Sequence, residues 1–152
     1  MHFSASENID APQETVFQEV TDFANFERHL RRAGGQIDRT GAPGPDCTWT
    51  GNVAFRGTTR EIEAKVDKWA APNGFTVLSH SGGLKVTADV TTVALSPTRT
   101  RLDILVDIKP QTLPARMLLQ SARLFKQKAN QRFKERVRAF AKSVSKRADS
   151  AI

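Results

Sequence analysis

The sequence predicts an α+β fold in which a curved antiparallel sheet packs against one long C-terminal helix. Two patterns support this prediction. Residues 35–109 alternate apolar and polar side chains between turn residues, as half-buried strands do. Residues 111–147 instead repeat apolar side chains every three or four positions and contain one proline and no glycine, which is typical of an amphipathic helix. The length of 152 residues suits one domain, expected over 1–147, with 148–152 fraying.

The N-terminal part of the chain predicts one strand followed by two short helices. Apolar and polar side chains alternate over residues 3–9, which is the period of a strand. Pro12 is suited to the start of a helix, because its missing N–H needs no partner there. The apolar stripe of this helix consists of Val16, Phe17, Val20 and Phe23. A second short helix, residues 24–32, is expected to carry Phe26 inward and to end at a glycine pair.

Turn residues divide the middle of the chain into strands. We expect a strand at 36–40, a loop at 41–46 and five further strands whose inward faces carry alternate apolar residues. The connections are too short for parallel crossovers, so neighbouring strands are expected to be antiparallel. The apolar positions change phase within residues 84–95, and a β-bulge near Thr91 and Thr92 would explain this change.

The C-terminal segment predicts one continuous helix with a single apolar stripe. A sheet with one apolar face needs a cover, and only this segment is long enough to provide it. The sequence therefore predicts that both Phe125 and Phe133 are buried against the sheet. The whole stripe consists of Leu118, Ala122, Phe125, Ala129, Phe133, Val137, Phe140 and Val144.

The net charge of +7 is concentrated in the same helix. Residues 111–152 hold eleven of the 23 Lys and Arg residues but only two of the 16 Asp and Glu residues. A solvated helix face is the simpler interpretation, and an anionic membrane surface is the alternative partner. Nucleic acid is disfavoured, because the chain has no tyrosine and the phenylalanines of the helix lie on its apolar stripe. The bases expected to meet a membrane are Arg132, Lys134, Arg136 and Arg138.

No catalytic or metal-binding constellation is evident in the sequence. The three histidines, His2, His29 and His80, have no metal-ligand spacing, and Cys47 has no nearby histidine in the sequence. Glycine-rich phosphate-binding motifs and the G-x-S-x-G nucleophile motif do not occur. We therefore expect no catalytic residue, no metal and no cofactor. A membrane span of about 20 apolar residues and a signal-peptide core are also missing, so a cytoplasmic location is expected.

Two stretches resemble a known family. The sequence ENIDAPQETVFQEVTDFANFERHL at residues 7–30 resembles the opening of the START-like, or SRPBCC, superfamily, also called polyketide cyclase/dehydrase-like. The sequence VALSPTRTRL at residues 93–102 resembles the hairpin between the last two strands of that family. The matching motif is I-x-A-P-x-E-x-V-F followed by D-F-x-x-F, at Ile9, Ala11, Pro12, Glu14, Val16, Phe17, Asp22, Phe23 and Phe26.

The resemblance implies a helix-grip fold, in which a seven-stranded antiparallel sheet wraps around the C-terminal helix and leaves a cavity between them. Members bind lipids, sterols, hormones or polyketides, and a minority catalyse cyclisation or dehydration. The apolar faces of the sheet and of the helix are expected to line this cavity. The candidate ligand-binding residues are Trp49, Val53, Phe55, Ile62, Val77, Val86 and Ile104 on the sheet, Leu118, Ala122 and Phe125 on the long helix, and Phe26 and His29 on the short helices.

These features favour a non-catalytic protein that binds or transports a hydrophobic small molecule, such as a lipid, a polyketide or an isoprenoid. One alternative is a cyclase or dehydratase that uses His29 or His80 as a general acid or base in the same cavity. Another is an interaction module that binds an anionic membrane or a partner through the basic helix. A monomer and a homodimer are both compatible with the sequence.

Overall fold

The computed structural model describes residues 1–55 and 57–150, apart from the side chain of Phe55. The strands are β1 (His2–Ile9), β2 (Gln36–Thr40), β3 (Thr48–Phe55), β4 (Thr58–Ala70), β5 (Gly74–Ser81), β6 (Leu84–Ser96) and β7 (Arg99–Pro110). The helices are α1 (Gln13–Val20), α2 (Phe23–Arg32), α3 (Leu113–Ala122) and α4 (Lys126–Ser150), with a 3₁₀ turn, η1 (Arg123–Phe125), between the last two. The predicted order of strand, two short helices, six strands and C-terminal helical segment is confirmed.

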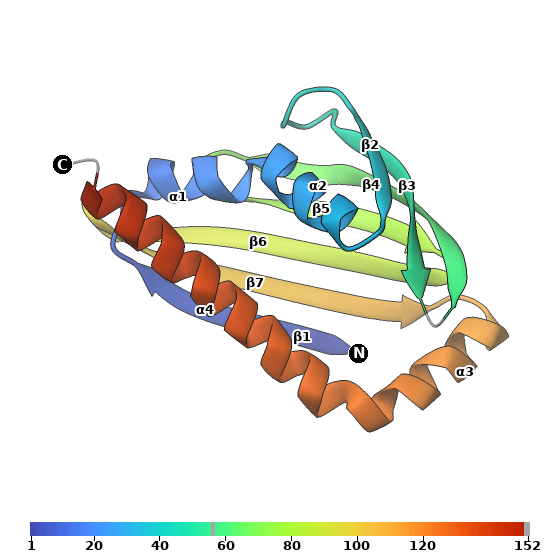
Figure 1. Ribbon diagram of the computed structural model, residues 1–152. Coiled ribbons are helices and arrows are strands. Elements are labelled where there is room, and N and C mark those ends of the chain that lie inside the picture. Colours follow the sequence, from blue (N-terminus) through green and yellow to red (C-terminus); the bar gives the residue numbers. More distant parts are fainter. Residues whose placement is uncertain (56, 151–152) are drawn as a thin grey trace.

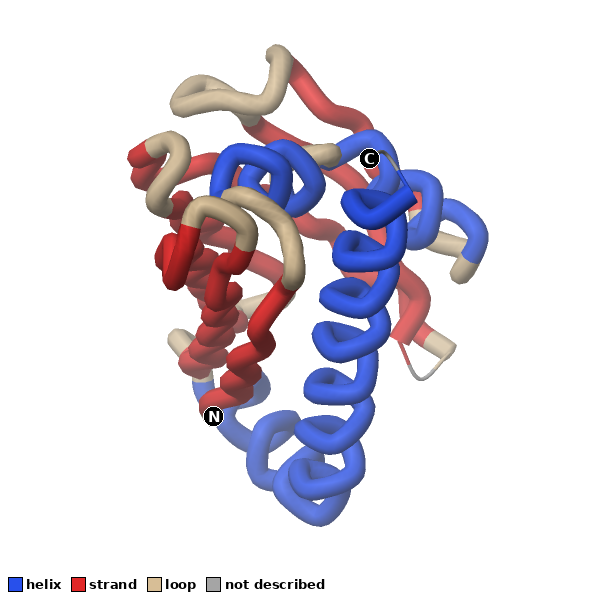
Figure 2. Tube along the Cα trace, turned by 90° about the vertical axis from the view of Figure 1, so that its left-hand side faces the viewer, coloured by secondary structure: helices blue, strands red, loops and turns tan. Residues whose placement is uncertain are grey.

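The seven strands form one antiparallel sheet in the order β1-β7-β6-β5-β4-β3-β2. The first strand therefore lies beside the last one, and Ile9 pairs with Thr100 at one end of this contact. Helices α1 and α2 lie along one border of the curved sheet, and α4 crosses its open side (Figure 1). Seen from the side, α4 stands opposite the strands while the short helices lie across one end (Figure 2). This is the predicted α+β helix-grip architecture.

Two glycine positions shape the sheet. Gly82 and Gly83 have φ angles of +52° and +80°, and they form the two-residue turn between β5 and β6. Such a turn requires positive φ at both central residues, which glycine adopts without steric cost. At Gly51 a Cβ atom would collide with the carbonyl oxygen of Gln36, so the absence of a side chain lets β2 approach β3.

The β-bulge predicted near Thr91 and Thr92 is wrong. Both residues keep regular pairing with β7, and the register shifts between Ala94 and Ser96 instead. Thr92 lies on the inward face and is 2% exposed. Its hydroxyl can be buried there because it donates a hydrogen bond to the carbonyl oxygen of Pro72. The apolar pattern therefore changes phase because a polar residue, Thr92, takes a buried position on the inward face, where it has a hydrogen-bond partner.

The single continuous helix predicted for 111–147 is also wrong. The axis changes direction at η1, so α3 and α4 meet at an angle (Figure 1). Thr112 caps α3 by accepting from the N–H of Ala115, whose side chain is 2% exposed, whereas α4 is held on the sheet by its own buried residues. Neither glycine nor proline marks the bend. Since α3 and α4 are each anchored by contacts of their own, we attribute the turn to tertiary contacts rather than to local sequence.

The core lies between the concave face of the sheet and helices α1, α2 and α4. It contains a group of neighbouring aromatic rings, most of them in edge contact, with centroids 5.0–6.2 Å apart: Phe17, Phe23, Trp49, Trp69 and Phe75. Such pairs stabilise the core beyond their buried area. Helix α4 continues past the predicted end at residue 147 to Ser150, and Ala148 packs against this core.

Candidate functional site

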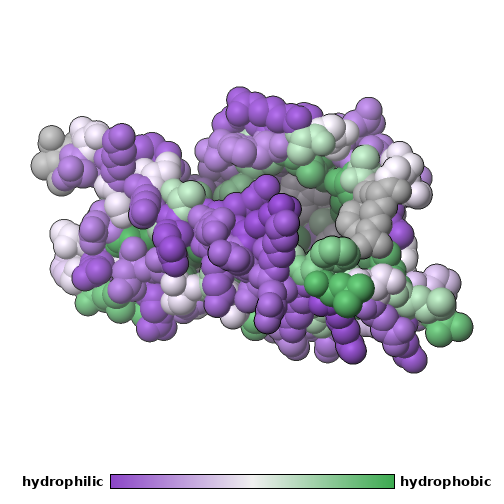
Figure 3. All heavy atoms as spheres, turned by 60° about the horizontal axis from the view of Figure 1, so that its bottom comes forward, coloured by the Kyte–Doolittle hydropathy of each residue, from purple (hydrophilic) through white to green (hydrophobic). Residues whose placement is uncertain are grey.

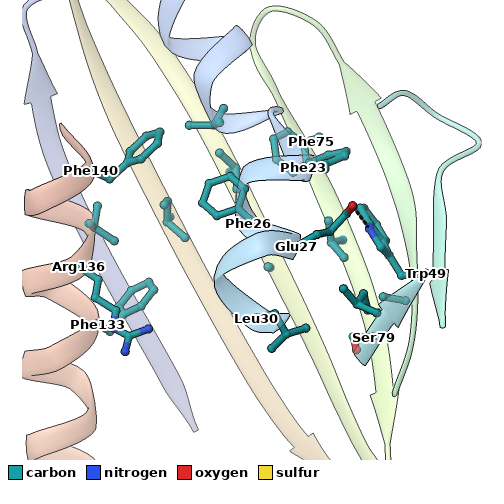
Figure 4. Close-up of a pocket in the computed structure, with 18 residues that line it drawn as sticks. Phe23, Phe26, Glu27, Leu30, Trp49, Phe75, Ser79, Phe133, Arg136 and Phe140 are labelled. Carbon is teal, nitrogen blue, oxygen red and sulfur yellow. Dashed lines mark hydrogen bonds between the residues drawn. The ribbon is translucent and has the colours of Figure 1, made fainter. Parts of the chain in front are cut away.

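An apolar cavity of about 550 Å³ lies between the concave face of the sheet and helices α2 and α4. Side chains from both helices and from the facing strands point into it (Figure 4). All but three of the 18 lining residues are apolar, and the three exceptions are Glu27, Ser79 and Arg136. A cavity of this composition is suited to an apolar guest that is positioned by a few polar contacts.

Small residues on the floor of the sheet create this space. Ala64 on β4 pairs with Ser79 on β5, and Ala88 lies on the adjacent strand β6. All three line the cavity. Larger side chains at these positions would fill part of this space, because protein interiors otherwise pack to near-crystalline density.

Glu27 is the one carboxylate on the wall of the described cavity. Helix α2 starts at Phe23, where the side chain of Asp22 accepts from the N–H of Asn25, and this start places Glu27 one turn after Phe23 on the inward face. The Oε2 atom of Glu27 accepts from Trp49 Nε1 at 2.9 Å and from Arg39 Nε at 2.8 Å. The buried carboxylate is thus tied to strands β2 and β3.

Cys47 lies buried near this ion pair. Burial raises the pKa of its thiol, and the nearby guanidinium of Arg39 opposes the shift only in part. A protonated and enclosed thiol is a poor nucleophile. The structure therefore places Cys47 in the core and outside the cavity wall.

Four of the candidate ligand-binding residues lie on the cavity wall: Phe26, Trp49, Val77 and Ile104. Three others, Val53, Ile62 and Val86, are half-buried but lie outside that wall, nearer the β3–β4 and β5–β6 turns. The side chain of Phe55 lies outside the described part of the chain.

The remaining candidates do not line this cavity. Leu118 and Ala122 lie on α3, and Phe125 in η1 is 57% exposed, because the bend carries this segment away from the sheet. His29 is exposed, with Nδ1 2.8 Å from the carbonyl oxygen of Asn25 in its own helix, and His80 is exposed as well. Because neither imidazole reaches the cavity, the version of the enzyme hypothesis that relied on them is wrong.

The sequence prediction missed several lining residues. Phe133, Val137 and Phe140 were expected only as core under the sheet, yet they form the α4 wall of the cavity. Glu27 was missed entirely, although it shares an apolar helix face with Phe23, and a charged residue on such a face is the available signal.

The four bases expected to meet a membrane have separate surroundings. Arg138 pairs with Glu7 at 3.3 Å, and Arg136 lines the cavity next to Phe133 (Figure 4). Arg132 and Lys134 are exposed. Bases two positions apart point about 200° apart around a helix, so the four cannot face one plane together.

Neither a metal-binding group nor a membrane-crossing helix is found in the described part of the chain. No group of His, Cys, Asp and Glu side chains within residues 1–55 and 57–150 could hold a metal ion. Over the same residues, no helix combines the length and the apolar character that crossing a membrane requires.

Comparisons with solved structures show the fold. No family model matches the sequence, and no curated protein sequence matches it. Zhui aromatase/cyclase from a Streptomyces species gives a TM-score of 0.66 at 12% identity, covering 97% of this chain and 94% of that one. Norcoclaurine synthase from Thalictrum flavum gives 0.64 at 9% identity, covering 97% and 95%. A START superfamily protein from Mycobacterium smegmatis gives 0.58 at 17% identity, covering 99% of both chains. The chain has the START-like, or SRPBCC, fold.

Proposed function

We propose that this START-like protein binds or transports a hydrophobic small molecule, such as a lipid, a polyketide or an isoprenoid, in the cavity between the sheet and α4. The observation that carries the proposal is the apolar cavity of about 550 Å³ on the concave face. Small-molecule sites typically measure about 300–1,000 Å³ and are mostly apolar. Phe26, Trp49, Val77 and Ile104 are the proposed ligand contacts among the residues expected from the sequence.

The energetic argument rests on apolar burial. At about 25 cal/mol per Å², a ligand that buries about 300 Å² of apolar surface gains roughly 7 kcal/mol. Loss of translational and rotational freedom offsets part of this gain, so affinity depends on a good fit. The cytoplasmic location, the absence of a cofactor and the monomeric or homodimeric state stay predictions.

Native mass spectrometry of freshly purified protein tests the proposal. We expect a co-purified apolar ligand, or binding from a panel of fatty acids, sterols, isoprenoid alcohols and aromatic polyketides. Ala88→Leu fills the cavity floor and should abolish that binding, because the leucine occupies space the ligand needs. Ala94→Leu places the same side chain on the exposed part of the same strand and should leave binding unchanged.

Thermal melting of both variants shows whether they fold. Absence of any ligand and of any binding from the panel would refute the proposal. Equal loss of binding in the two variants would show that the ligand lies elsewhere on the protein.

An enzyme of the cyclase or dehydratase type is the second candidate. Two neighbours of the same fold are named as an aromatase/cyclase and a synthase. With both histidines outside the cavity, such an enzyme would have to use Glu27, Ser79 or Arg136. Turnover of a panel ligand that Glu27→Gln abolishes without weakening binding would favour it over the carrier.

A further inference from the structure

The two carboxylate oxygens of Glu27 differ in their partners. Oε2 accepts from both Trp49 and Arg39, whereas Oε1 accepts no hydrogen bond from any described residue. Oε1 is nevertheless not fully enclosed by protein atoms, although the residue as a whole is only 8% exposed. Because Glu27 lines the cavity, a ligand held there lies beside this carboxylate.

We propose that the ligand carries a hydrogen-bond donor, a hydroxyl or an N–H, that binds Oε1 of Glu27. This inference rests on the proposed function of the cavity. A carboxylate paired with an arginine can only accept hydrogen bonds, so the complementary ligand group must donate one. An apolar ligand without a donor displaces water from Oε1 and puts nothing in its place, which costs affinity. The cavity therefore selects amphiphilic molecules over plain hydrocarbons.

Three fluorescent probes of nearly equal shape test this inference: anthracenemethanol, which carries a donor, and methylanthracene and methoxymethylanthracene, which do not. The wild-type protein should bind the alcohol about tenfold more tightly than either of the others, since hydrogen bonds to charged groups are among the stronger ones. Glu27→Gln should remove most of that preference, because the neutral amide is the weaker acceptor. Glu61→Gln, on an exposed site of β4, should retain the preference.

The outcomes separate the two proposals. Equal binding of all three probes to the wild type would overturn the role of Glu27 while leaving the hydrophobic cavity function intact. No binding of any probe would count against the cavity function itself, and the donor inference would fall with it. If Glu27→Gln fails to fold, the wild-type ranking of the three probes alone decides.

A second, independent observation concerns the surface of α3 and η1. Four large apolar side chains on this segment are exposed: Leu113 (68%), Met117 (61%), Leu124 (85%) and Phe125 (57%). Leu113 and Met117 lie one turn apart on the same face of α3, and Leu124 and Phe125 follow in η1. We call these four residues the apolar corner. No described residue covers it, and it is a large apolar surface for a protein to expose to water.

Positive charge surrounds the apolar corner. Residues 111–134 contain six Lys and Arg residues and no Asp or Glu. Three of these bases, Arg116, Arg123 and Lys126, line one surface hollow next to the corner. Apolar side chains flanked by bases complement an anionic lipid surface, because the bases meet the headgroups while the apolar groups enter the acyl boundary.

The apolar corner lies close to the opening of the cavity. In Figure 3 hydrophobic side chains gather at the junction of α3 and α4, on the same face of the protein as the hollow that leads to the cavity. Three of the four corner residues are aliphatic, so they fit acyl chains better than stacked bases. We infer that this corner docks on an anionic lipid bilayer, with the cavity opening towards the lipid.

Sedimentation with vesicles tests the docking. The wild type should bind phosphatidylcholine vesicles that contain phosphatidylglycerol and should release them as salt rises. The double variant Leu124→Ser with Phe125→Ser should bind at least tenfold more weakly. The matched control, Leu95→Ser with Leu105→Ser, changes two other exposed leucines, on β6 and β7, and should bind like the wild type.

Four results would overturn this inference. The first two are failure of the wild type to bind the anionic vesicles and an equal loss of vesicle binding in both double variants. The third is binding of single-stranded nucleic acid in place of vesicles. The fourth is a wild-type dimer that binds no vesicles and that the Leu124→Ser, Phe125→Ser variant converts to a monomer. Arg116→Gln with Arg123→Gln should weaken vesicle binding and flatten its salt dependence, since fewer bases then meet the headgroups.

Discussion

Helix α4 and the segment formed by α3 and η1 have the same sequence pattern but opposite surroundings. Both carry apolar residues every three or four positions, and both are rich in Lys and Arg. On α4 the stripe is covered, with Val137 6%, Ala141 4% and Val144 1% exposed. On α3 and η1 the stripe residues Leu118 and Ala122 are only half-buried and Phe125 is 57% exposed, and Ala115 is the one buried residue described there. Periodicity thus identifies a helix face but does not show what covers it.

The difference follows from the contacts that each segment makes with the rest of the protein. Helix α4 lies against β1 and is tied to it by the ion pair between Arg138 and Glu7. The start of α3 is held at the end of β7, where the N–H of Gln111 donates to the carbonyl oxygen of Gly83. From that fixed point α3 extends beyond the sheet, so Ala115 near its start is buried while Leu113 and Met117 stay exposed.

The largest effect expected from this contrast comes from placing a charge on an apolar residue of each segment. Val144→Asp buries a carboxylate without a partner and should lower the free energy of unfolding by at least about 4 kcal/mol. Leu124→Asp makes the same kind of change in the apolar corner and should alter stability by no more than about 0.5 kcal/mol. Urea denaturation followed by circular dichroism measures both. A comparable loss in the two variants would mean that the corner is covered.

A smaller contrast is expected from two phenylalanines. Phe133 is half-buried and its ring centroid lies 6.2 Å from that of Phe3 on β1, so Phe133→Ala should cost about 2–3 kcal/mol. Phe125→Ala should cost less than about 1 kcal/mol, because the side chain is already 57% exposed. Equal costs measured by urea denaturation would restore the continuous buried stripe that the sequence alone suggested.

Much of the fold follows from local sequence patterns. Alternation, turn residues and the helical stripe predict the elements and their order, and the two glycines of the β5–β6 turn mark its position. The bend at η1 has no local signal, because it depends on where α3 and α4 are anchored. The misplaced bulge has a similar cause, since the partner of Thr92 is Pro72, twenty residues earlier in the chain.

The candidate site is less accessible to sequence reasoning. Alternation places Trp49, Val77 and Ile104 on the inward face of the sheet, and these residues do line the cavity. Local patterns do not reveal that the small residues Ala64 and Ala88 lie on the floor of the cavity, because that depends on strand register. Glu27 is equally hidden, since its burial depends on Arg39 and Trp49, twelve and 22 positions away.

The smallest predicted difference concerns the charges of the two segments. Arg147 on α4 meets Glu19 on α1, with Nη2 2.7 Å from Oε2, and both side chains are partly exposed. Removing such a pair typically costs about 0.5 kcal/mol and rarely more than about 1 kcal/mol. Arg147→Gln should therefore destabilise the protein slightly at low salt, and the loss should disappear at high salt because screening weakens the pair in the wild type as well.

The matched control is Arg123→Gln in η1, where no ion pair is found among the described residues. It should leave stability unchanged at either salt concentration. A double-mutant cycle with Glu19→Gln isolates the coupling between Arg147 and Glu19 from other effects of each change. Zero coupling would show that the pair between Arg147 and Glu19 does not help to hold α4 on the body of the protein. Coupling at Arg147 together with unchanged stability of Arg123→Gln would show that this base of α4 contributes to the fold while the base in η1 does not.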